Sequence, residues 1–247
     1  MPRDPRPISD SVLRARGLVK VHGSGRGARR ILDGVDLDVH AGELIAIVGR
    51  SGSGKSTLLQ LLGGLDRADA GTVEVAGRTI AAPRMPSERR LSAVRREEIG
   101  FVFQFFHLLP ELDGAANVLL PTTLPGAPRG AAARGRELIA RLGLQDVAGL
   151  RPHQLSGGEQ QRFALARALV GDPSLVLADE PIGNLDAAAG DVVLDLLRAA
   201  ADDGRAVVMV THQAEATARA DRVLRLDGGR LAEVEDEADS GQVHASG

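Results

Sequence analysis

The sequence predicts an α/β fold, built on a largely parallel sheet with helices covering both faces. Two observations support this prediction. Short, purely apolar runs alternate with segments of helical character along most of the 247 residues, which is the order expected of a parallel sheet with crossover helices. The longest of these runs, such as 44–48 and 206–210, have only five residues. That length suits a buried strand and falls far short of the about 20 residues of a membrane-spanning helix.

The expected elements follow from the pattern of apolar residues. Alternation with a period of two predicts half-buried strands at 12–20 and 35–39, separated by a loop rich in Gly and Arg at 23–30. Further strands are expected at 44–48, 72–75, 175–178 and 206–210, and a closing hairpin pairs 222–226 with 230–234. Helices are expected at 57–62, 88–98, 134–142, 187–201 and 214–219, and from Gly158 to about residue 170.

Five prolines between residues 110 and 152 interrupt short helical stretches. We therefore predict an inserted helical lobe at about 101–170, within a single domain that spans 11–234. The acidic and then small, polar residues 235–247 predict a disordered tail. A second such tail is expected at 1–10, which lacks the apolar stretch of a signal peptide. The chain is therefore expected to be cytoplasmic, with any membrane role depending on a partner.

The composition excludes several classes of function. Cysteine is absent, which rules out a disulfide scaffold, a Cys-ligated zinc site, an iron–sulfur cluster and a thiol nucleophile. A net charge of −3 and a pI of about 6.1 argue against nucleic acid as a partner. Only Lys20 and Lys55 among the 30 basic residues are lysines, and the chain has neither Trp nor Tyr. The context of each lysine is therefore informative.

Lys55 belongs to a match to the phosphate-loop pattern, Gly-x4-Gly-Lys-Ser/Thr, between an expected strand and an expected helix. The candidate nucleotide-binding residues are Gly49, Arg50, Ser51, Gly52, Ser53, Gly54, Lys55, Ser56 and Thr57. Glycines let backbone N–H groups surround an anion, and the following helix directs its positive end at it. We expect Lys55 to reach the β- and γ-phosphates and the Ser56 hydroxyl to bind Mg²⁺. The alternative, a chance Gly/Ser turn before a lysine, does not explain the flanking strand and helix.

Two carboxylates, Asp179 and Glu180, follow the apolar strand at 175–178, at the edge of a parallel sheet where ligands bind. We expect Asp179 to hold Mg²⁺ through water, and Glu180 to orient or deprotonate the attacking water. In isolation the pair is equally well interpreted as ordinary acidic residues at a strand end. Beside a phosphate loop, the catalytic interpretation is favoured, and the two elements together predict a P-loop NTPase.

A third motif narrows the class. It starts a helix and consists of Leu155, Ser156, Gly157, Gly158, Glu159, Gln160, Gln161 and Arg162. A Ser cap followed by two glycines forms a second anion-binding helix start, and this segment resembles the signature sequence of ATP-binding cassette (ABC) ATPases. The resemblance implies ATP and Mg²⁺ as cofactors and a head-to-tail dimer, in which Leu155–Glu159 of one copy close on the ATP held by the other. It also implies an N-terminal antiparallel β subdomain beside the parallel core and the inserted helical lobe.

Other segments resemble ABC motifs in the expected order. Gln104 resembles the glutamine that touches Mg²⁺ and links the site to the helical lobe, although taken alone it is better interpreted as an exposed loop residue. Asp186, in Gly-Asn-Leu-Asp, resembles the D-loop of the dimer interface, and His212 resembles the switch histidine that contacts the γ-phosphate. The family usually stacks a tyrosine on adenine, and His22 stands at that position here. We predict that His22 stacks on the base, the competing interpretation being a solvated loop residue.

Residues 99–112 and 178–186 most resemble the ABC subgroup of lipoprotein release, macrolide or peptide export and cell division (LolD-, MacB- and FtsE-like). Four of the five Phe lie between 101 and 106, which suits either a surface for a membrane permease or the core of the lobe. Ile182 and Ala116 replace the usual Thr and Glu of this pattern. Neither change removes an ATP ligand, but the loss of the Glu puts in doubt its polar contact with a permease.

The resemblance implies an ATPase subunit that works as a dimer of identical copies on the cytoplasmic face of the inner membrane, bound to integral membrane permease subunits. Closure of the dimer around ATP would drive export or lipoprotein release. The alternative is a cassette coupled to membrane proteins that regulate cell-wall hydrolysis in division. A soluble translation or DNA-maintenance ABC protein usually has two cassettes or a long coiled-coil insertion, and a P-loop kinase or GTPase leaves the 155–162 motif unexplained.

Overall fold

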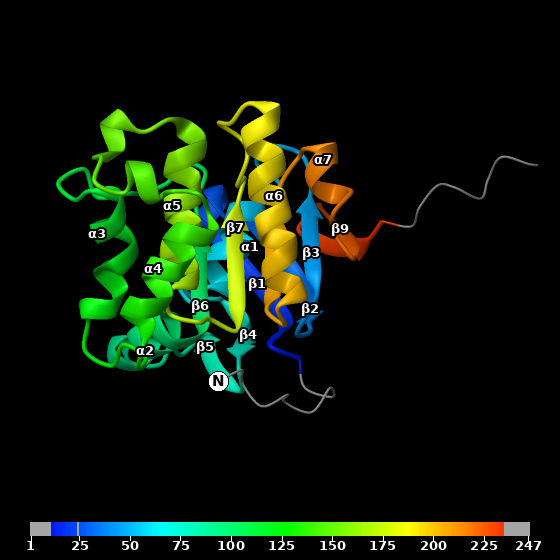
Figure 1. Cartoon of the computed structure of the whole chain (residues 1–247). Coiled ribbons are helices and arrows are strands. Elements are labelled where there is room, and N and C mark those ends of the chain that lie inside the picture. The colour runs from blue at the N-terminus through cyan, green and yellow to red at the C-terminus, as the bar shows by residue number, and fades with distance from the viewer. Residues whose placement is uncertain (1–10, 24, 235–247) are drawn as a thin grey trace, which may run out of the picture.

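The computed structural model describes residues 11–23 and 25–234 (Figure 1). The tails predicted at 1–10 and 235–247 lie outside these described residues. The strands form two sheets. The first has four antiparallel strands in the order β2 (Arg29–Val39), β1 (Leu13–His22), β4 (Ala70–Val75) and β5 (Arg78–Ala81). The second has six strands in the order β10 (Arg230–Glu233), β9 (Arg222–Asp227), β3 (Leu44–Val48), β8 (Ala206–Val210), β7 (Leu175–Asp179) and β6 (Ile99–Val102).

All neighbours in the six-stranded sheet are parallel, except that β10 pairs antiparallel with β9 at the edge. The helices are α1 (Lys55–Leu62), α2 (Glu88–Glu98), α3 (Gly114–Leu119), α4 (Ala131–Arg141), α5 (Gly157–Leu169), α6 (Ala187–Asp202) and α7 (Ala214–Thr217). Short 3₁₀ turns occur at Gly25–Gly27, Leu120–Thr123, Gln145–Val147 and Pro152–Gln154. Helices α3, α4 and α5 pack together beyond the β6 edge, at the left of Figure 1. The predicted α/β class, with its antiparallel subdomain, parallel core and helical lobe, is confirmed.

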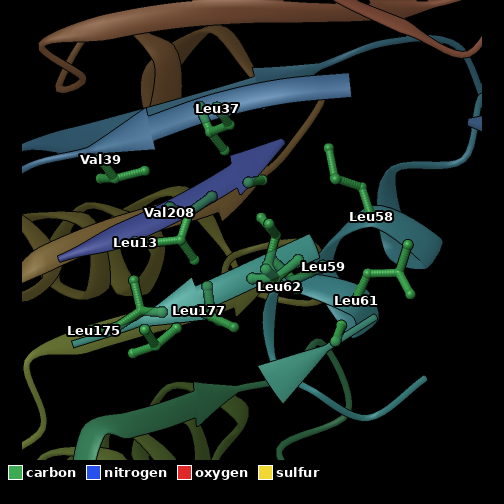
Figure 2. Packing of buried hydrophobic residues seen from close by; sticks show 14 of the residues in the cluster. Leu13, Leu37, Val39, Leu58, Leu59, Leu61, Leu62, Leu175, Leu177 and Val208 are labelled. Atoms are coloured by element: carbon green, nitrogen blue, oxygen red, sulfur yellow. The ribbon is translucent and has the colours of Figure 1, made fainter. Parts of the chain in front are cut away.

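The central parallel strands β3, β7 and β8 are buried on both faces, which explains their continuous apolar sequence. Along β7, Leu175 and Leu177 face α1 and the antiparallel sheet, whereas Val176 and Ala178 face the cluster that includes α5 and α6. Figure 2 shows the first of these layers, in which the leucines of α1 lie among side chains of both sheets. The helix of the phosphate loop is therefore fixed between the two sheets.

The structure extends the sequence prediction at several elements. Strand β2 starts at Arg29, inside the predicted loop at 23–30, because its exposed arginines pair with the end of β1. Strands β5 and β6 were not predicted. Each has four residues, and β6 follows α2 with no intervening turn residue, so the pattern gives no sign of a boundary. The lobe prediction of about 101–170 therefore begins inside β6. None of the helices in the described residues is long and apolar enough to cross a membrane.

Candidate nucleotide site

Four loops leave adjacent strands of the six-stranded sheet at one edge. In the order β3, β8, β7 and β6, they contain the phosphate loop, His212, Glu180 and Gln104. The strand ends are level, because Val210 of β8 pairs with Ile47 on one side and with Asp179 on the other. Parallel strands end at the same edge of a sheet, and the loops there commonly form ligand sites. The fold therefore gathers residues that lie more than 100 positions apart in the sequence.

Two glycines of the phosphate loop, Gly49 and Gly54, are required by close contacts. A Cβ on Gly49 would lie 2.5 Å from the carbonyl oxygen of Leu226, and a Cβ on Gly54 would lie 2.7 Å from Cγ2 of Ile31. Gly54 also has a φ of +104° and caps the N-terminus of α1, a backbone conformation that L side chains rarely adopt. The exposed tip of the loop consists of Arg50, Ser51 and Gly52, and Ser53 N donates to Arg50 O at 3.1 Å.

Lys55 is the first residue of α1, so the helix begins two residues before the predicted start at Thr57. Its ammonium donates to the carbonyl oxygens of Gly49 and Arg50, at 2.9 and 3.3 Å. The loop thus curls around its own lysine, at the positive end of a helix. Ser56 and Thr57 follow in the first helical turn, with Ser56 exposed towards the carboxylates of β7.

Ser56 and Asp179 bring two oxygen ligands together, since the Ser56 hydroxyl donates to Asp179 Oδ1 at 3.5 Å. Burial raises the pKa of Asp179, and the charge of Glu180 adds to this effect, against the lowering contributions of Ser56 and Lys55. A cation beside this carboxylate would stabilise its charged form. Among the described residues, no group of three or more His, Cys, Asp or Glu could hold a metal. Mg²⁺ needs no such cage, because it binds one or two protein oxygens together with substrate phosphates and water.

Glu180 and His212 form a pair at the ends of β7 and β8. His212 Nδ1 lies 2.9 and 3.0 Å from the two carboxylate oxygens of Glu180, and because an ionised carboxylate only accepts, Nδ1 donates. The imidazole is 66% exposed, whereas the Glu180 side chain is only 16% exposed. Glu180 has a φ of +44°, a strained conformation for a non-glycine residue. Backbone hydrogen bonds from Glu180 N to Val210 O (2.9 Å) and from Gly183 N to Glu180 O (3.0 Å) hold it there.

Gln104 follows β6 and touches the loop after Glu180. A Cβ on Gly183 would lie 3.0 Å from Gln104 Nε2, and the Asn184 side-chain amide donates to Gln104 O at 3.0 Å. The structure therefore brings the loop that contains Gln104 against the Gly-Asn-Leu-Asp segment. Sequence patterns alone gave no indication of the Asn184 contact.

The 155–162 motif starts α5 as predicted, with Ser156 as the N-cap. Ser156 Oγ accepts from Glu159 N at 3.3 Å, and Glu159 Oε2 accepts from Ser156 N at 2.7 Å, a reciprocal capping box. Leu155 is buried just before the cap. A hollow of about 340 Å³ lies between this helix start and the beginning of α6, and it is lined in part by Ser156, Gly157, Gly158 and Asp186. A Cβ on Gly158 would lie 2.9 Å from the Ala189 Cβ, so glycine permits this close approach.

His22 is the exposed last residue of β1. Within the described residues, no hydrogen bond joins it to the phosphate loop, so its predicted stacking on adenine stays a prediction. Its neighbour Lys20 has a clear role, because its ammonium pairs with Asp66 at 2.6 Å and donates to Arg67 O at 2.8 Å. Val21 N donates to Asp69 Oδ2 at 2.7 Å. The loop after α1 thereby fixes the end of the strand that presents His22.

Two buried polar side chains and one partly buried arginine were not predicted from the sequence. Asn117 of α3 is fully buried and bonds the backbone of the loop at 109–113. Gln161 of α5 is fully buried and donates to the carbonyl of Pro181, the residue after Glu180, at 2.6 Å. Arg167, two turns further along α5, bonds the backbone after Gln104. A polar residue among the apolar residues of a helix was the available signal for each, but the partners of Gln161 and Arg167 lie 20 and 60 residues away in the sequence.

A phosphate loop, two carboxylates and a histidine at the edge of a parallel sheet define a nucleoside-triphosphatase fold. Residues 32–183 match the family model described as "ABC transporter". The chain belongs to this family and is an ATPase of the ATP-binding cassette type.

Two relatives cover most of the chain. The lipoprotein-releasing system ATP-binding protein LolD of Ruegeria sp. (strain TM1040) is 49% identical over 92% of this chain and 100% of its own length. The macrolide export ATP-binding/permease protein MacB 1/2 of Paracoccus denitrificans (strain Pd 1222) is 48% identical over 89% of this chain but only 33% of its own length. The predicted LolD- and MacB-like subgroup is thus confirmed.

A solved structure supports the same fold. The dimeric ATP-binding cassette MJ0796 in a post-hydrolysis state, bound to ADP and Pi, superposes with a TM-score of 0.80 at 35% identity. The match covers 90% of this chain and 98% of that one. The predicted cassette fold and ATPase class therefore agree with an independent structure.

Proposed function

We propose that this chain is the ATP-hydrolysing subunit of a membrane complex for lipoprotein release or export, and that it acts as a head-to-tail dimer of identical copies. The observation that supports this most directly is the Glu180–His212 pair, which lies one residue along β7 from the Ser56–Asp179 pair. One pair offers a base, and the other offers oxygen ligands for a metal ion. The Ser56–Asp179 pair is adjacent to a lysine held inside a phosphate loop.

Each residue has a role that its surroundings support. Lys55, with the loop N–H groups, binds the β- and γ-phosphates of ATP. Ser56, Asp179 and Gln104 hold Mg²⁺, which when bound neutralises charge on the phosphates. Glu180 orients the attacking water and accepts its proton, and the Nδ1–H of His212 holds the carboxylate in place. Nε2 of His212 binds the γ-phosphate as a donor, which requires that it also carries a proton. The strained backbone of Glu180 fits such a role, because strain of this kind often occurs at active sites.

The hollow at the start of α5 supports the dimer. Its glycines and capped helix N-terminus offer N–H donors to an anion, but they belong to a second element, separate from the phosphate loop. A head-to-tail arrangement lets Leu155–Glu159 of each copy close on the ATP bound by the other, with Asp186 at the interface. The dimeric form of the MJ0796 cassette is consistent with this proposal.

The names of the relatives support the membrane role. LolD belongs to a lipoprotein-releasing system and MacB to macrolide export, so we place this chain on the cytoplasmic face of the inner membrane, bound to permease subunits. These names favour release or export over the alternative of regulating cell-wall hydrolysis in division. The exposed Phe105 and Leu109, 69% and 42% exposed, support the prediction that the aromatic segment contacts a permease. Phe101 instead packs beneath α1, against Gly63, so the segment serves both surface and core.

The Glu180→Gln variant tests the mechanism. It removes the base but keeps the shape of the side chain, so ATP turnover should fall by a factor on the order of 10² to 10⁴, while Mg-ATP binding persists and a dimer accumulates on size exclusion. Lys55→Ala should instead lose tight ATP binding. Glu215→Gln is a matched control, because Glu215 is an exposed carboxylate of α7, and this variant should hydrolyse ATP at the wild-type rate. Wild-type turnover by Glu180→Gln contradicts the assignment of the base.

A further inference from the structure

The segment after Gln104 has an unusual backbone. Phe106 and His107 have φ values of +60° and +49°, and two successive L residues in this left-handed region are unfavourable without external support. The kink turns Phe105 outwards, where it is 69% exposed. Phe103 stacks on Phe101 at a centroid distance of 5.7 Å and contacts the His107 ring at 4.7 Å, with the two rings tilted by 48°.

Arg167 of α5 supports this kink. Its guanidinium donates to the carbonyl oxygens of His107 at 2.6 Å and of Phe106 at 2.9 Å. Burial lowers the pKa of Arg167, and within the described part of the chain the side chain forms no ion pair with a carboxylate. A cation desolvated without a counter-charge is costly, so the two carbonyls are its compensating partners. Arginine suits this position because its planar fork donates to two acceptors at once.

A second tether lies on the other side of Phe105. The Asn184 side chain donates to Gln104 O at 3.0 Å, and Asn184 belongs to the loop between Glu180 and α6. Phe105 therefore lies between a contact with the helix that begins at Ser156 and a contact with the loop that follows the carboxylates. Neither tether packs Phe105 itself into the core.

We propose that Arg167 and Asn184 are positioning residues that make the exposed Phe105 move with the nucleotide site. This inference rests on the proposed function, because ATP binding and dimer closure are the events that displace α5 and the Asn184 loop. Arg167 transmits the displacement of α5 to the backbone of Phe106 and His107, and Asn184 transmits that of its loop to Gln104. The position of Phe105 at the protein surface then depends on whether ATP is bound.

The composition permits a direct test. The chain contains neither Trp nor Tyr, so Phe105→Trp in the Glu180→Gln background gives a single, background-free fluorophore on the segment. Mg-ATP binding is measured separately by equilibrium dialysis. In this parent protein, Mg-ATP should shift the emission and anisotropy of the tryptophan. A parent that does not bind ATP contradicts the proposed function, and one that binds ATP without any shift contradicts only the present inference.

Variants of the tethers then decide the role of Arg167. Arg167→Lys keeps the charge but provides no fork, and Arg167→Gln removes both. Each should bind ATP with parental affinity and lose the ATP-dependent shift. Arg134→Gln is the matched control, because Arg134 also donates to a backbone carbonyl at the C-terminal end of α5, Val170 O at 3.0 Å, but not to the 105–107 segment, and it should keep the shift. If neither Arg167 variant folds, Asn184→Ala tests the coupling through the second tether, and its loss of the shift supports the proposal. A full shift in any folded tether variant overturns it.

Discussion

Replacing Asn117 with alanine should destabilise the loop between β6 and α3. The side chain lies on α3 and is fully buried, with 0% exposure, and it forms hydrogen bonds to the loop backbone through both its oxygen and its nitrogen. Its Oδ1 accepts from Leu109 N at 2.7 Å, and its Nδ2 is shared among the carbonyls of Leu109, Leu112 and Asp113, at 3.1, 3.2 and 3.0 Å. This single amide therefore sets the path of the chain from the Phe105 segment into the lobe.

The magnitude follows from which groups lose their partner. Leu109 O still accepts from Leu112 N, and Asp113 O still accepts from the backbone N of residue 117. Leu109 N and Leu112 O have no such substitute among the described residues, and each costs about 1–3 kcal/mol when left unpaired. Alanine's higher helix propensity offsets roughly 0.5 kcal/mol. Since the loop is only partly buried and water can reach it, we expect a loss of about 2–4 kcal/mol.

Urea and thermal unfolding measure this change. The expected loss corresponds to a decrease in Tm of roughly 5–15 °C for a chain of this size. Thr123→Ala is a suitable control, because its exposed hydroxyl also bonds a lobe carbonyl, Leu120 O at 2.8 Å, and its effect should stay within about 0.5 kcal/mol. A decrease below about 1 kcal/mol for Asn117→Ala refutes the reasoning, since it means that the loop backbone does not depend on the amide.

Three further predictions concern the site and the surface. Gly54→Ala forces a Cβ to within 2.7 Å of Ile31 Cγ2 at a φ of +104°, so the Kd for ATP should rise roughly tenfold or more, and a titration showing an unchanged Kd contradicts this. Burial raises the pKa of Asp66, but the hydrogen bond and charge of Lys20, the backbone N–H of Arg67 and the charge of His22 together outweigh it and hold the pKa below the ordinary 3.8. The pair therefore stabilises the fold above the ordinary pKa and ceases to do so as the pH falls through the lowered value. Lys20→Met should lower Tm at neutral pH, and the loss in the free energy of unfolding should be less than about 1 kcal/mol. Below the lowered pKa of Asp66 the variant and the wild type should be equally stable. A stability difference that does not change with pH argues against the pair. Phe105→Ser should leave Tm unchanged and weaken co-sedimentation with membranes from the native cell, and undiminished co-sedimentation contradicts a permease contact there.

Much of the fold and of the phosphate site could be predicted because their signals are local. Strand β3 has five apolar residues followed at once by the Gly-rich loop and a helix, so strand, loop and helix identify one another. The carboxylates after β7 have the same property. In both places the candidate functional residues directly follow a buried strand in the sequence. Strands that are buried on both faces have continuous apolar sequences and are therefore easy to recognise.

The rest depends on tertiary contacts that leave no local pattern. Strand β6 has only four residues, including a glycine, and it follows a helix directly, so its pairing with β7 alone makes it a strand. Arg167 and Asn184 bond backbone carbonyls 60 and 80 residues away. A backbone carbonyl is present at every position, so the sequence gives no complementary residue type by which to recognise such a partner. The phosphate loop could be predicted from its own residues, whereas the Phe105 segment could not.

The alternation of side chains along β7 explains why the two carboxylates have different surroundings, and it supports the different roles proposed for them. Leu175 and Leu177 face α1, and a period of two places Asp179 on that same face, beside Ser56 in the first turn of α1. Glu180 would continue towards the opposite face, but its φ of +44° turns it out of the strand and towards His212. A slip of one residue in the pairing of β7 with β8 would reverse the faces and separate Asp179 from Ser56. The proposed assignment of Asp179 as metal ligand and Glu180 as base therefore depends on the register of the sheet as much as on the two acidic residues.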